Sequence, residues 1–237
     1  MSTVLITGAN RGFGLELAKQ YAAAGWRVLA CARRSSPALA GLAGLQDTVE
    51  VHSLDVLEED QIDRLAVALR NERIDVLINN AAILGKHGVF DQQSMAEQSF
   101  GKLDQEDWLR VFRVNVLAPM KMTEAFVDLV AASEQKKIVT FTSMLGSVAL
   151  NTIGGLYYYR TSKAAVNAMM KSMAIDLGRR GILACAIHPG WARTDMGGER
   201  ATEDPVEAIR GVRQIIAGLH AGNVGQVLAF DGSVVPY

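Results

Sequence analysis

Short hydrophobic runs alternate along the chain with longer stretches in which hydrophobic residues recur every three or four positions. Runs of consecutive Val, Ile and Leu predict strands buried on both faces, as in a parallel sheet covered by helices. Such runs lie at residues 3–7, 27–31, 49–52, 75–79, 137–142, 183–187 and 226–229. The helical pattern occupies residues 13–24, 58–71, 104–132, 156–179 and 205–219. This alternation predicts an α/β fold with a doubly wound sheet of about seven parallel strands and helices on both faces.

No internal repeat, low-complexity tract or linker rich in Pro, Gly and Ser divides the 237 residues. Residues 1–237 are therefore expected to form a single domain. The longest stretch without clear periodicity is 84–103, directly after the fourth expected strand. Loops of this length in a compact domain are usually functional, and sheets of this kind bind ligands at the carboxyl ends of their strands.

The composition indicates a cytoplasmic protein. Lys and Arg number 24 against 25 Asp and Glu, a net charge of -1, which does not favour nucleic acid or an anionic membrane as partner. The N-terminus does not resemble an export signal, and no apolar stretch approaches the roughly 18 residues of a membrane span. Cys31 and Cys185 lie in apolar runs without metal-site spacing, so we expect two reduced thiols and no metal.

The first expected strand runs into the sequence TGANRGFG, which contains Gly8, Gly12 and Gly14 and leads directly into a helix. Glycines at such a turn let a pyrophosphate approach backbone N–H groups, and the helix N-terminus adds partial positive charge. The spacing is GxxxGxG, which differs from the GxGxxG of the better-known dinucleotide fingerprint. Because the glycines lie between a strand and a helix, the sequence nevertheless predicts a Rossmann-type dinucleotide site. The alternative, that the three glycines only shape a turn, is less favoured.

The region after the second expected strand indicates which dinucleotide is bound. A free ribose 2'-hydroxyl is usually held by an Asp or Glu at the end of this strand, but nothing acidic occurs between Glu16 and Asp47. The strand ends instead in CARR, with Arg33 and Arg34, and Arg11 lies inside the glycine turn. Guanidinium groups pair well with a phosphate, so NADP(H) is the expected cofactor over NAD.

Asp55 follows the third expected strand and is placed to accept a hydrogen bond from the adenine amino group. As a lone aspartate it has an alternative role, as a helix cap for the segment that begins near Glu58.

The sequence GLYYYRTSKA at residues 155–164 contains three consecutive tyrosines before a lysine. Residues four apart on an α-helix lie within about 40° of one another, which pairs Tyr159 with Lys163 and leaves Tyr157 and Tyr158 pointing elsewhere. A nearby ammonium stabilises a phenolate and lowers a tyrosine pKa from its usual value of about 10. Beside a dinucleotide, Tyr159 is expected to donate a proton to a carbonyl oxygen as hydride reaches the carbon. A YxxxK spacing alone also occurs by chance on many helices.

Several motifs occur together in the order and places expected of one family. They are TGANRGFG, NNAA at 79–82, VNV around Asn115, TSMLGS with Ser143, YRTSK at 159–163 and HPGWARTDM at 188–196. The chain resembles the short-chain dehydrogenase/reductases over essentially its whole length. In SMLGS, GGLYYYRTSKAAVN and PGWARTDMGG it is similar to the C-factor and sniffer type of carbonyl reductase.

The resemblance implies a role for each catalytic residue. Ser143 would hold the substrate carbonyl oxygen, and Tyr159 would donate the proton. Lys163 would bind the nicotinamide ribose and tune Tyr159, while Asn115 would anchor a water relay. The full set of expected cofactor-binding residues is Gly8, Asn10, Arg11, Gly12, Phe13, Gly14, Arg33, Asp55, Val56, Asn80, Ala81, Ala82, Tyr159, Lys163, Pro189, Gly190 and Thr194.

Tyr157 and Trp191 are expected to line the substrate pocket, with core packing as the alternative for Tyr157. The chain after Thr194 passes quickly into the next expected helix, which predicts a short lid and an open pocket. Such a pocket favours apolar or aromatic carbonyl compounds as substrates. His188 is expected to be an ordinary residue at a strand end.

The expected function is therefore NADPH-dependent reduction of an aldehyde or ketone. One alternative is an NAD-dependent alcohol dehydrogenase of the same fold, which would need the missing carboxylate. Another is a non-catalytic NADP-binding signalling module, which has no chemical need for a tuned tyrosine. Small residues along the helix after Tyr157 permit close packing against a second copy of the chain. Members of the family that the chain resembles are commonly dimers or tetramers, so we expect a homodimer or homotetramer.

Overall fold

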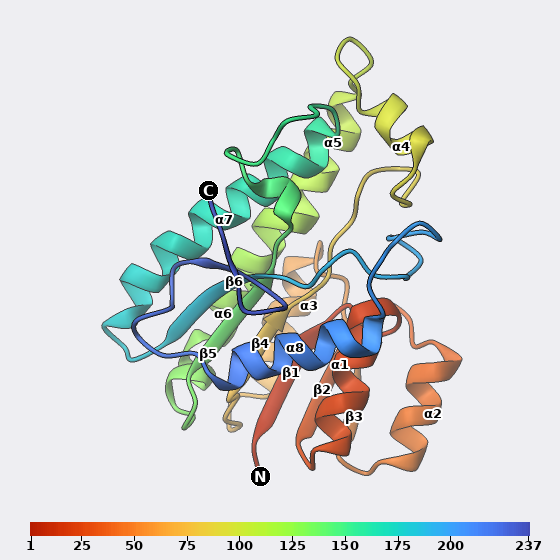
Figure 1. The fold of residues 1–237 in the computed structure, drawn as a ribbon. Helices are drawn as coiled ribbons and strands as arrows, with labels where there is room; N and C mark the ends of the chain where they lie inside the picture. Colours follow the sequence, from red (N-terminus) through yellow and green to blue (C-terminus); the bar gives the residue numbers. More distant parts are fainter.

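One eight-stranded sheet runs through the protein in a computed structural model that describes residues 1–237 (Figure 1). Its order is β3-β2-β1-β4-β5-β6-β7-β8; the first seven strands are parallel and β8 pairs antiparallel with β7. The predicted doubly wound α/β fold is thus confirmed. The strands are β1 (Thr3–Thr7), β2 (Arg27–Ala32), β3 (Val49–Ser53), β4 (Val76–Asn79), β5 (Lys137–Phe141), β6 (Leu183–His188), β7 (Val227–Ala229) and β8 (Val234–Val235).

Helices cover both faces of this sheet (Figure 1). They are α1 (Gly12–Ala23), α2 (Pro37–Leu45), α3 (Glu59–Ala68), α4 (Gln92–Glu97), α5 (Gln105–Phe112), α6 (Ala118–Ala131), α7 (Tyr157–Gly178) and α8 (Pro205–Ala217). A π-helical turn, Arg113–Leu117, joins α5 to α6, and a 3-10 turn, Met144–Gly146, follows β5. None of these helices combines the length and the hydropathy needed to cross a bilayer.

The alternation of side chains along β1 shows how the two cores are built. Val4 and Ile6 pack with α1 and α8, whereas Leu5 points to the other face and packs with α3, α6 and α7. Side chains along a strand alternate between the two faces of the sheet. A strand whose two faces are both covered by helices therefore needs apolar residues at every position. Two hydrophobic cores therefore share one sheet.

The helical predictions need three corrections. The expected helix at 104–132 is divided by the π-helical turn around Asn115, and the pattern of hydrophobic residues continues through that turn. Helix α2 was not predicted, although Ser36 caps it and Pro37 occupies its first turn. Segment 84–103 is not without structure, because Asp91 caps the short helix α4 within it.

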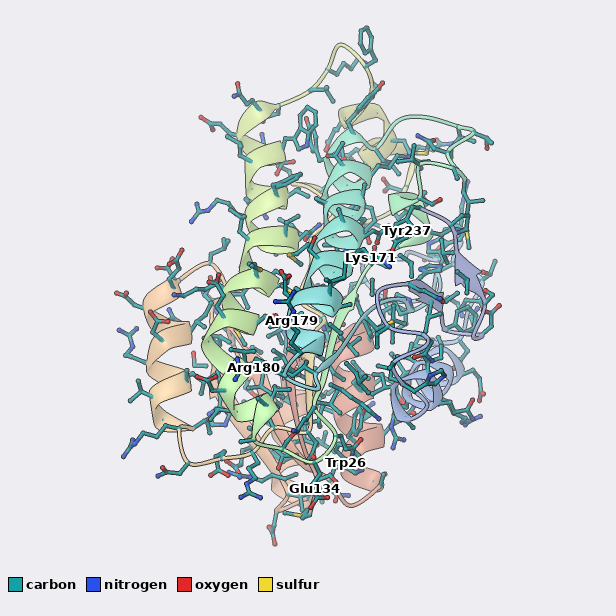
Figure 2. All side chains as sticks on the ribbon, turned by 90° about the vertical axis from the view of Figure 1, so that its left-hand side faces the viewer. Trp26, Glu134, Lys171, Arg179, Arg180 and Tyr237 are labelled. Carbon is teal, nitrogen blue, oxygen red and sulfur yellow. The ribbon has the colours of Figure 1, made fainter.

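The segments that follow the carboxyl ends of the strands gather at one edge of the sheet, the upper edge in Figure 1. Figure 2 marks the opposite edge by Trp26 and Glu134, which precede β2 and β5. The expected site residues in the glycine turn, after β5 and at the start of α7 all belong to the first edge.

The glycine turn between β1 and α1 is packed too tightly for side chains. Gly8 and Gly12 have φ values of 69° and 52°, in the left-handed region that favours glycine. A Cβ at Gly14 would lie 2.2 Å from the Gly8 carbonyl oxygen. The Asn80 side-chain amide donates to the Thr7 and Gly8 carbonyl oxygens at 2.8 and 3.2 Å, which ties this turn to the end of β4.

Substitution Gly14→Ala should destabilise the protein because its Cβ would overlap a backbone oxygen that cannot move away. The expected loss is about 1–3 kcal/mol of unfolding free energy, measured by urea denaturation. The control Gly41→Ala places its Cβ in open space within α2, so it should be neutral or stabilise by up to about 1 kcal/mol. Equal stability of both variants would contradict the packing described for the turn.

Candidate active site

A cavity of about 840 Å³ opens at the carboxyl edge of the sheet and runs from the glycine turn to the start of α7. Nearly all of the expected site residues line it, although they come from distant parts of the sequence. These are Gly8, Asn10, Arg11, Gly12, Phe13, Arg33, Asp55, Val56, Asn80, Ala81, Ala82, Ser143, Tyr159, Lys163, Pro189, Gly190, Trp191 and Thr194.

Three of the expected residues do not line the cavity. Gly14 lies behind the turn, where its lack of a side chain allows α1 to approach Gly8. Asn115 is buried beneath the cavity wall. Tyr157 also lies outside, so its expected place in the substrate pocket is wrong; it is the first residue of α7 and projects away from Tyr159 on the helix.

Basic residues flank the end of the cavity nearest β2. Arg33 directly follows this strand, and Arg11 projects from the glycine turn. Arg11 forms an exposed ion pair with Asp195 at 2.9 Å, across the cavity mouth. Asp55 accepts the Leu57 N–H at 3.0 Å in a local turn before α3, so it is not the side-chain cap of that helix.

Ser143, Tyr159 and Lys163 meet at the other end of the cavity. Ser143 begins the 3-10 turn after β5, and its hydroxyl accepts the Leu145 N–H at 3.1 Å. Tyr159 and Lys163 lie one turn apart on α7, with the lysine Nζ 5.5 Å from the centre of the tyrosine ring. The Nζ donates to the Phe141 carbonyl oxygen at 2.8 Å, so the ammonium is directed at the end of β5. The hydroxyl groups of Ser143 and Tyr159 and the amino group of Lys163 thus lie at the same end of the cavity.

Burial sets the protonation of these groups. It raises the pKa of Tyr159 to about 12, with a smaller opposing effect from hydrogen bonding to Ser143, and lowers the pKa of Lys163 to about 7. Tyr159 is still partly accessible through the cavity, while protein surrounds its other sides. Desolvation is the largest cause of both shifts, and it raises the pKa of Tyr159 where the sequence led us to expect that Lys163 would lower it. Both groups are therefore mostly uncharged once the pH is well above 7.

The 3-10 turn rests directly on the backbone of α7. A Cβ at Gly146 would lie 2.7 Å from the Lys163 carbonyl carbon. The Thr142 hydroxyl donates to Asn167 Oδ1 at 2.5 Å, and Asn167 Nδ2 donates to the Gly146 carbonyl oxygen at 3.3 Å. These contacts hold the segment carrying Ser143 against the helix that carries the tyrosine and the lysine.

The N-terminus of α7 is held by segment 84–108. Leu156 precedes the helix in a left-handed conformation and provides no side-chain cap. Gln98, only 2% exposed, instead accepts the Tyr159 N–H at 3.3 Å and donates to the Leu84 carbonyl oxygen at 2.8 Å. The Tyr158 hydroxyl accepts the Asp104 N–H. A free N–H at a helix start needs such a partner, so the long segment completes the helix that carries Tyr159.

Asn115 braces the same region from below. Its Oδ1 accepts the Ile83 N–H at 2.9 Å, and its Nδ2 donates to the Ile83 carbonyl oxygen and to the Ser162 hydroxyl at 2.8 and 3.0 Å. Both amide hydrogens are used by protein atoms. Asn115 lies in the π-helical turn, a feature that often marks functional sites.

Two loops meet over the mouth of the cavity. The rings of Phe90 and Trp191 contact edge to face with centroids 5.3 Å apart. The Phe90 N–H donates to the Met196 carbonyl oxygen at 2.8 Å, and the Trp191 indole donates to Gly197. The segment after β4 therefore helps to cover the cavity together with the loop after β6.

Sequence reasoning missed Gln98, Gly146, Phe90 and Arg160. Only Arg160 carried a usable signal, because it immediately follows Tyr159 and could be placed beside the site by adjacency. Gln98 is 61 positions from the residue it contacts, and nothing in the local pattern indicates that pairing.

The sequence matches a model of the short chain dehydrogenase family over residues 2–205. The chain belongs to this family. Among relatives, it is 37% identical over 164 residues to C-signal of Myxococcus xanthus, which covers 69% of this chain and 93% of that protein. The expected resemblance to the C-factor and sniffer type is thereby supported on the sequence side.

Solved structures of other family members have the same architecture. Carbonyl reductase Sniffer of D. melanogaster superposes with a TM-score of 0.88 at 28% identity, covering 100% of both chains. The NADPH-bound carbonyl reductase from chicken fatty liver gives a TM-score of 0.89 at 26% identity, covering 100% of this chain and 99% of the other. The predicted family and subgroup are confirmed.

The buried Lys163 should make the stability of this short chain dehydrogenase depend on pH between 7 and 9. In the unfolded chain its pKa returns to 10.5, so the unfolded state binds more protons than the folded state in this window. Unfolding free energy should therefore rise with pH, by at most about 1.4 kcal/mol per pH unit from this group. Lys163→Met should flatten the slope, measured by denaturant titrations at several pH values.

Lys171, on the exposed side of the same helix, is the matched control (Figure 2). Lys171→Met should keep the wild-type slope. Above pH 9 the buried Cys31 and Cys185, whose pKa values rise to about 12, favour the unfolded state and reverse the trend, so the comparison stays below that value. An unchanged slope in Lys163→Met would argue against a desolvated lysine.

Proposed function

We propose that this short chain dehydrogenase reduces aldehydes or ketones with NADPH. The observation that carries the proposal is the common cavity: Ser143, Tyr159 and Lys163 face its one end, and the glycine turn forms the other. A cavity of about 840 Å³ has room for a dinucleotide and a small substrate side by side.

The cradle formed by the glycine turn fits a dinucleotide. Gly8 and Gly12 expose backbone at the cavity wall, and Gly14 admits the N-terminus of α1 to the same place. A pyrophosphate would be held by the N–H groups at this helix start and by its partial positive charge.

Two arginines support NADP(H) over NAD(H). Arg33 and Arg11 line the cavity where the adenosine ribose would lie, and β2 is not followed by a carboxylate. Arg11 is paired with Asp195 through an exposed bridge, which is easily exchanged for a phosphate. The chicken fatty liver relative, solved with NADPH, supports the same choice.

Each residue at the catalytic end has its own role in the proposed carbonyl reduction. The bound nicotinamide supplies hydride to the carbonyl carbon. Ser143 holds the carbonyl oxygen by a hydrogen bond, and Tyr159 donates its phenolic proton to that oxygen. Lys163 would bind the nicotinamide ribose, and its protonated form would stabilise the resulting phenolate. Asn115 keeps the floor of the site in place through Ile83 and Ser162.

The mouth of the cavity indicates the type of substrate. Phe90, Trp191 and Met144 present apolar surface around the catalytic end. A substrate with an apolar or aromatic body would be desolvated by these side chains, so such aldehydes and ketones are the first compounds to test.

The function is tested by titrating the purified protein with NADPH and NADH and by following nicotinamide absorbance with a panel of aldehydes, ketones and quinones. We expect tighter binding of NADPH and turnover of apolar carbonyl compounds. Tyr159→Phe should reduce kcat by at least about 100-fold without weakening NADPH binding more than about threefold, because only the proton donor is lost.

Tyr158→Phe is the matched control for the choice of tyrosine, since its hydroxyl only accepts the Asp104 N–H outside the cavity. It should retain most of the wild-type kcat. Preference for NADH would favour an alcohol dehydrogenase that uses NAD. Binding of NADPH without turnover, and without any effect of Tyr159→Phe, would favour a nucleotide-binding signalling module.

A further inference from the structure

Arg160 is a buried cation on the cavity wall without a counter-charge. It immediately follows Tyr159 on α7, is only 9% exposed, and lines the same cavity. Its single hydrogen bond runs from Nη1 to the Leu145 carbonyl oxygen, at a long 3.3 Å. The Nε has no partner, and no carboxylate lies within ion-pair distance.

Another partly buried arginine shows what is missing at Arg160. Arg27 pairs with both Glu50 and Glu72, which raise its pKa. The pKa of Arg160 is lowered, and burial is the cause. Removing a guanidinium from water without a compensating anion is unfavourable, so the free protein lacks an interaction at this point that a ligand can supply.

The wall around Arg160 also restricts what that ligand is. Arg160 bonds to Leu145, and the cavity lining from the same segment, 144–153, also includes Met144, Leu150 and Ile153. This segment contains no acidic residue. The cavity's own carboxylates are in segments after β3 and β6, and one of them, Asp195, already pairs with Arg11. The catalytic end therefore combines an apolar surface with a guanidinium that has no carboxylate partner, whereas Arg110 is paired with Asp107 and the Lys163 Nζ is bonded to the Phe141 carbonyl oxygen.

We propose that Arg160 binds the carboxylate of a carbonyl substrate, so that the preferred substrates are aldehydes or ketones with an apolar body and a carboxylate group. The inference rests on the proposed carbonyl reduction and names its substrate class. A guanidinium presents a planar pair of N–H donors to a carboxylate, and its position one residue after Tyr159 sets the anionic group apart from the reacting carbonyl. This substrate class refines the purely apolar one expected from sequence.

The test measures kcat/KM with NADPH for 2-, 3- and 4-carboxybenzaldehyde and for their methyl esters. It is carried out on the wild type and on the variants Arg160→Met and Arg160→Lys. At least one acid should have a kcat/KM about 10-fold or more above its ester in wild type. Arg160→Met should lose roughly 10- to 100-fold on that acid, mainly through KM, and change the ester by less than about threefold. Arg160→Lys should retain part of the preference, because it keeps the charge without the planar fork.

Arg179 is the matched control, since it is an exposed arginine at the other end of α7 (Figure 2). Arg179→Met should keep the wild-type ratio of acid to ester. Thermal unfolding and NADPH affinity are measured for every variant to detect misfolding. If Arg160→Met weakens acid and ester equally, Arg160 only holds Leu145 in place and the inference is overturned. An equal preference for acid and ester in wild type overturns it as well.

Calorimetric titration with benzoate and benzamide, in the presence of NADPH, separates this inference from the proposed reaction. Benzoate should bind to wild type and about 10-fold or more weakly to Arg160→Met, while benzamide should not distinguish them. If no aldehyde in the panel is reduced but benzoate binding depends on Arg160, carbonyl reduction fails and the anion site stands. If aldehydes are reduced and benzoate does not bind, the reaction stands and the anion site fails.

Discussion

The backbone contact between Gly146 and Lys163 fixes the separation between the two halves of the candidate catalytic set. Ser143 belongs to the turn, and Tyr159 and Lys163 belong to the helix on which the turn rests. Because a Cβ at position 146 would lie 2.7 Å from the Lys163 carbonyl carbon, the two segments are as close as backbone atoms permit. A distance between two segments that is set by backbone packing varies far less than one set by two flexible side chains. Transfer of a proton from Tyr159 to a substrate held by Ser143 depends on the distance between these two segments.

The rest of the architecture keeps this contact in place. Gln98 completes the first turn of α7 from one side, and Asn115 ties Ser162 to the segment after β4 from below. The sheet edge supplies Phe141, whose carbonyl oxygen receives the lysine Nζ. Close fitting of this kind also buries Ser143 and Lys163. The same burial raises the pKa of Tyr159 and lowers that of Lys163, so the phenol keeps its proton until charge develops on a substrate oxygen.

Sequence patterns predicted the sheet well and the site only in part. Seven strands were recognisable because burial on both faces demands uninterrupted apolar runs, whereas the two residues of β8 are too few for any pattern. Motifs with fixed local spacing, the glycine turn and the pair Tyr159 and Lys163, located the cavity. Tyr157 does not line the cavity because it lies two residues before Tyr159, which places its side chain on another face of α7.

Contacts between distant segments set the limit of prediction. The bond from the Tyr159 N–H to Gln98 and the packing of Gly146 on Lys163 depend on the tertiary fold, and neither follows from local periodicity. Spacing on a helix likewise pairs Lys163 with Tyr159 but says nothing of how much water remains around either group. Desolvation is a property of the folded molecule.

The most direct test of this account is the kcat of Gly146→Ala on a carbonyl substrate that the wild type reduces, with NADPH affinity measured beside it. Because the added Cβ pushes the turn from α7, we expect kcat to fall by about 100-fold while the dissociation constant for NADPH changes by less than about threefold. Gly178→Ala, which places its Cβ in open space at the end of the same helix, should leave kcat unchanged. A wild-type kcat in a folded Gly146→Ala protein would contradict the claim that this contact positions the catalytic groups.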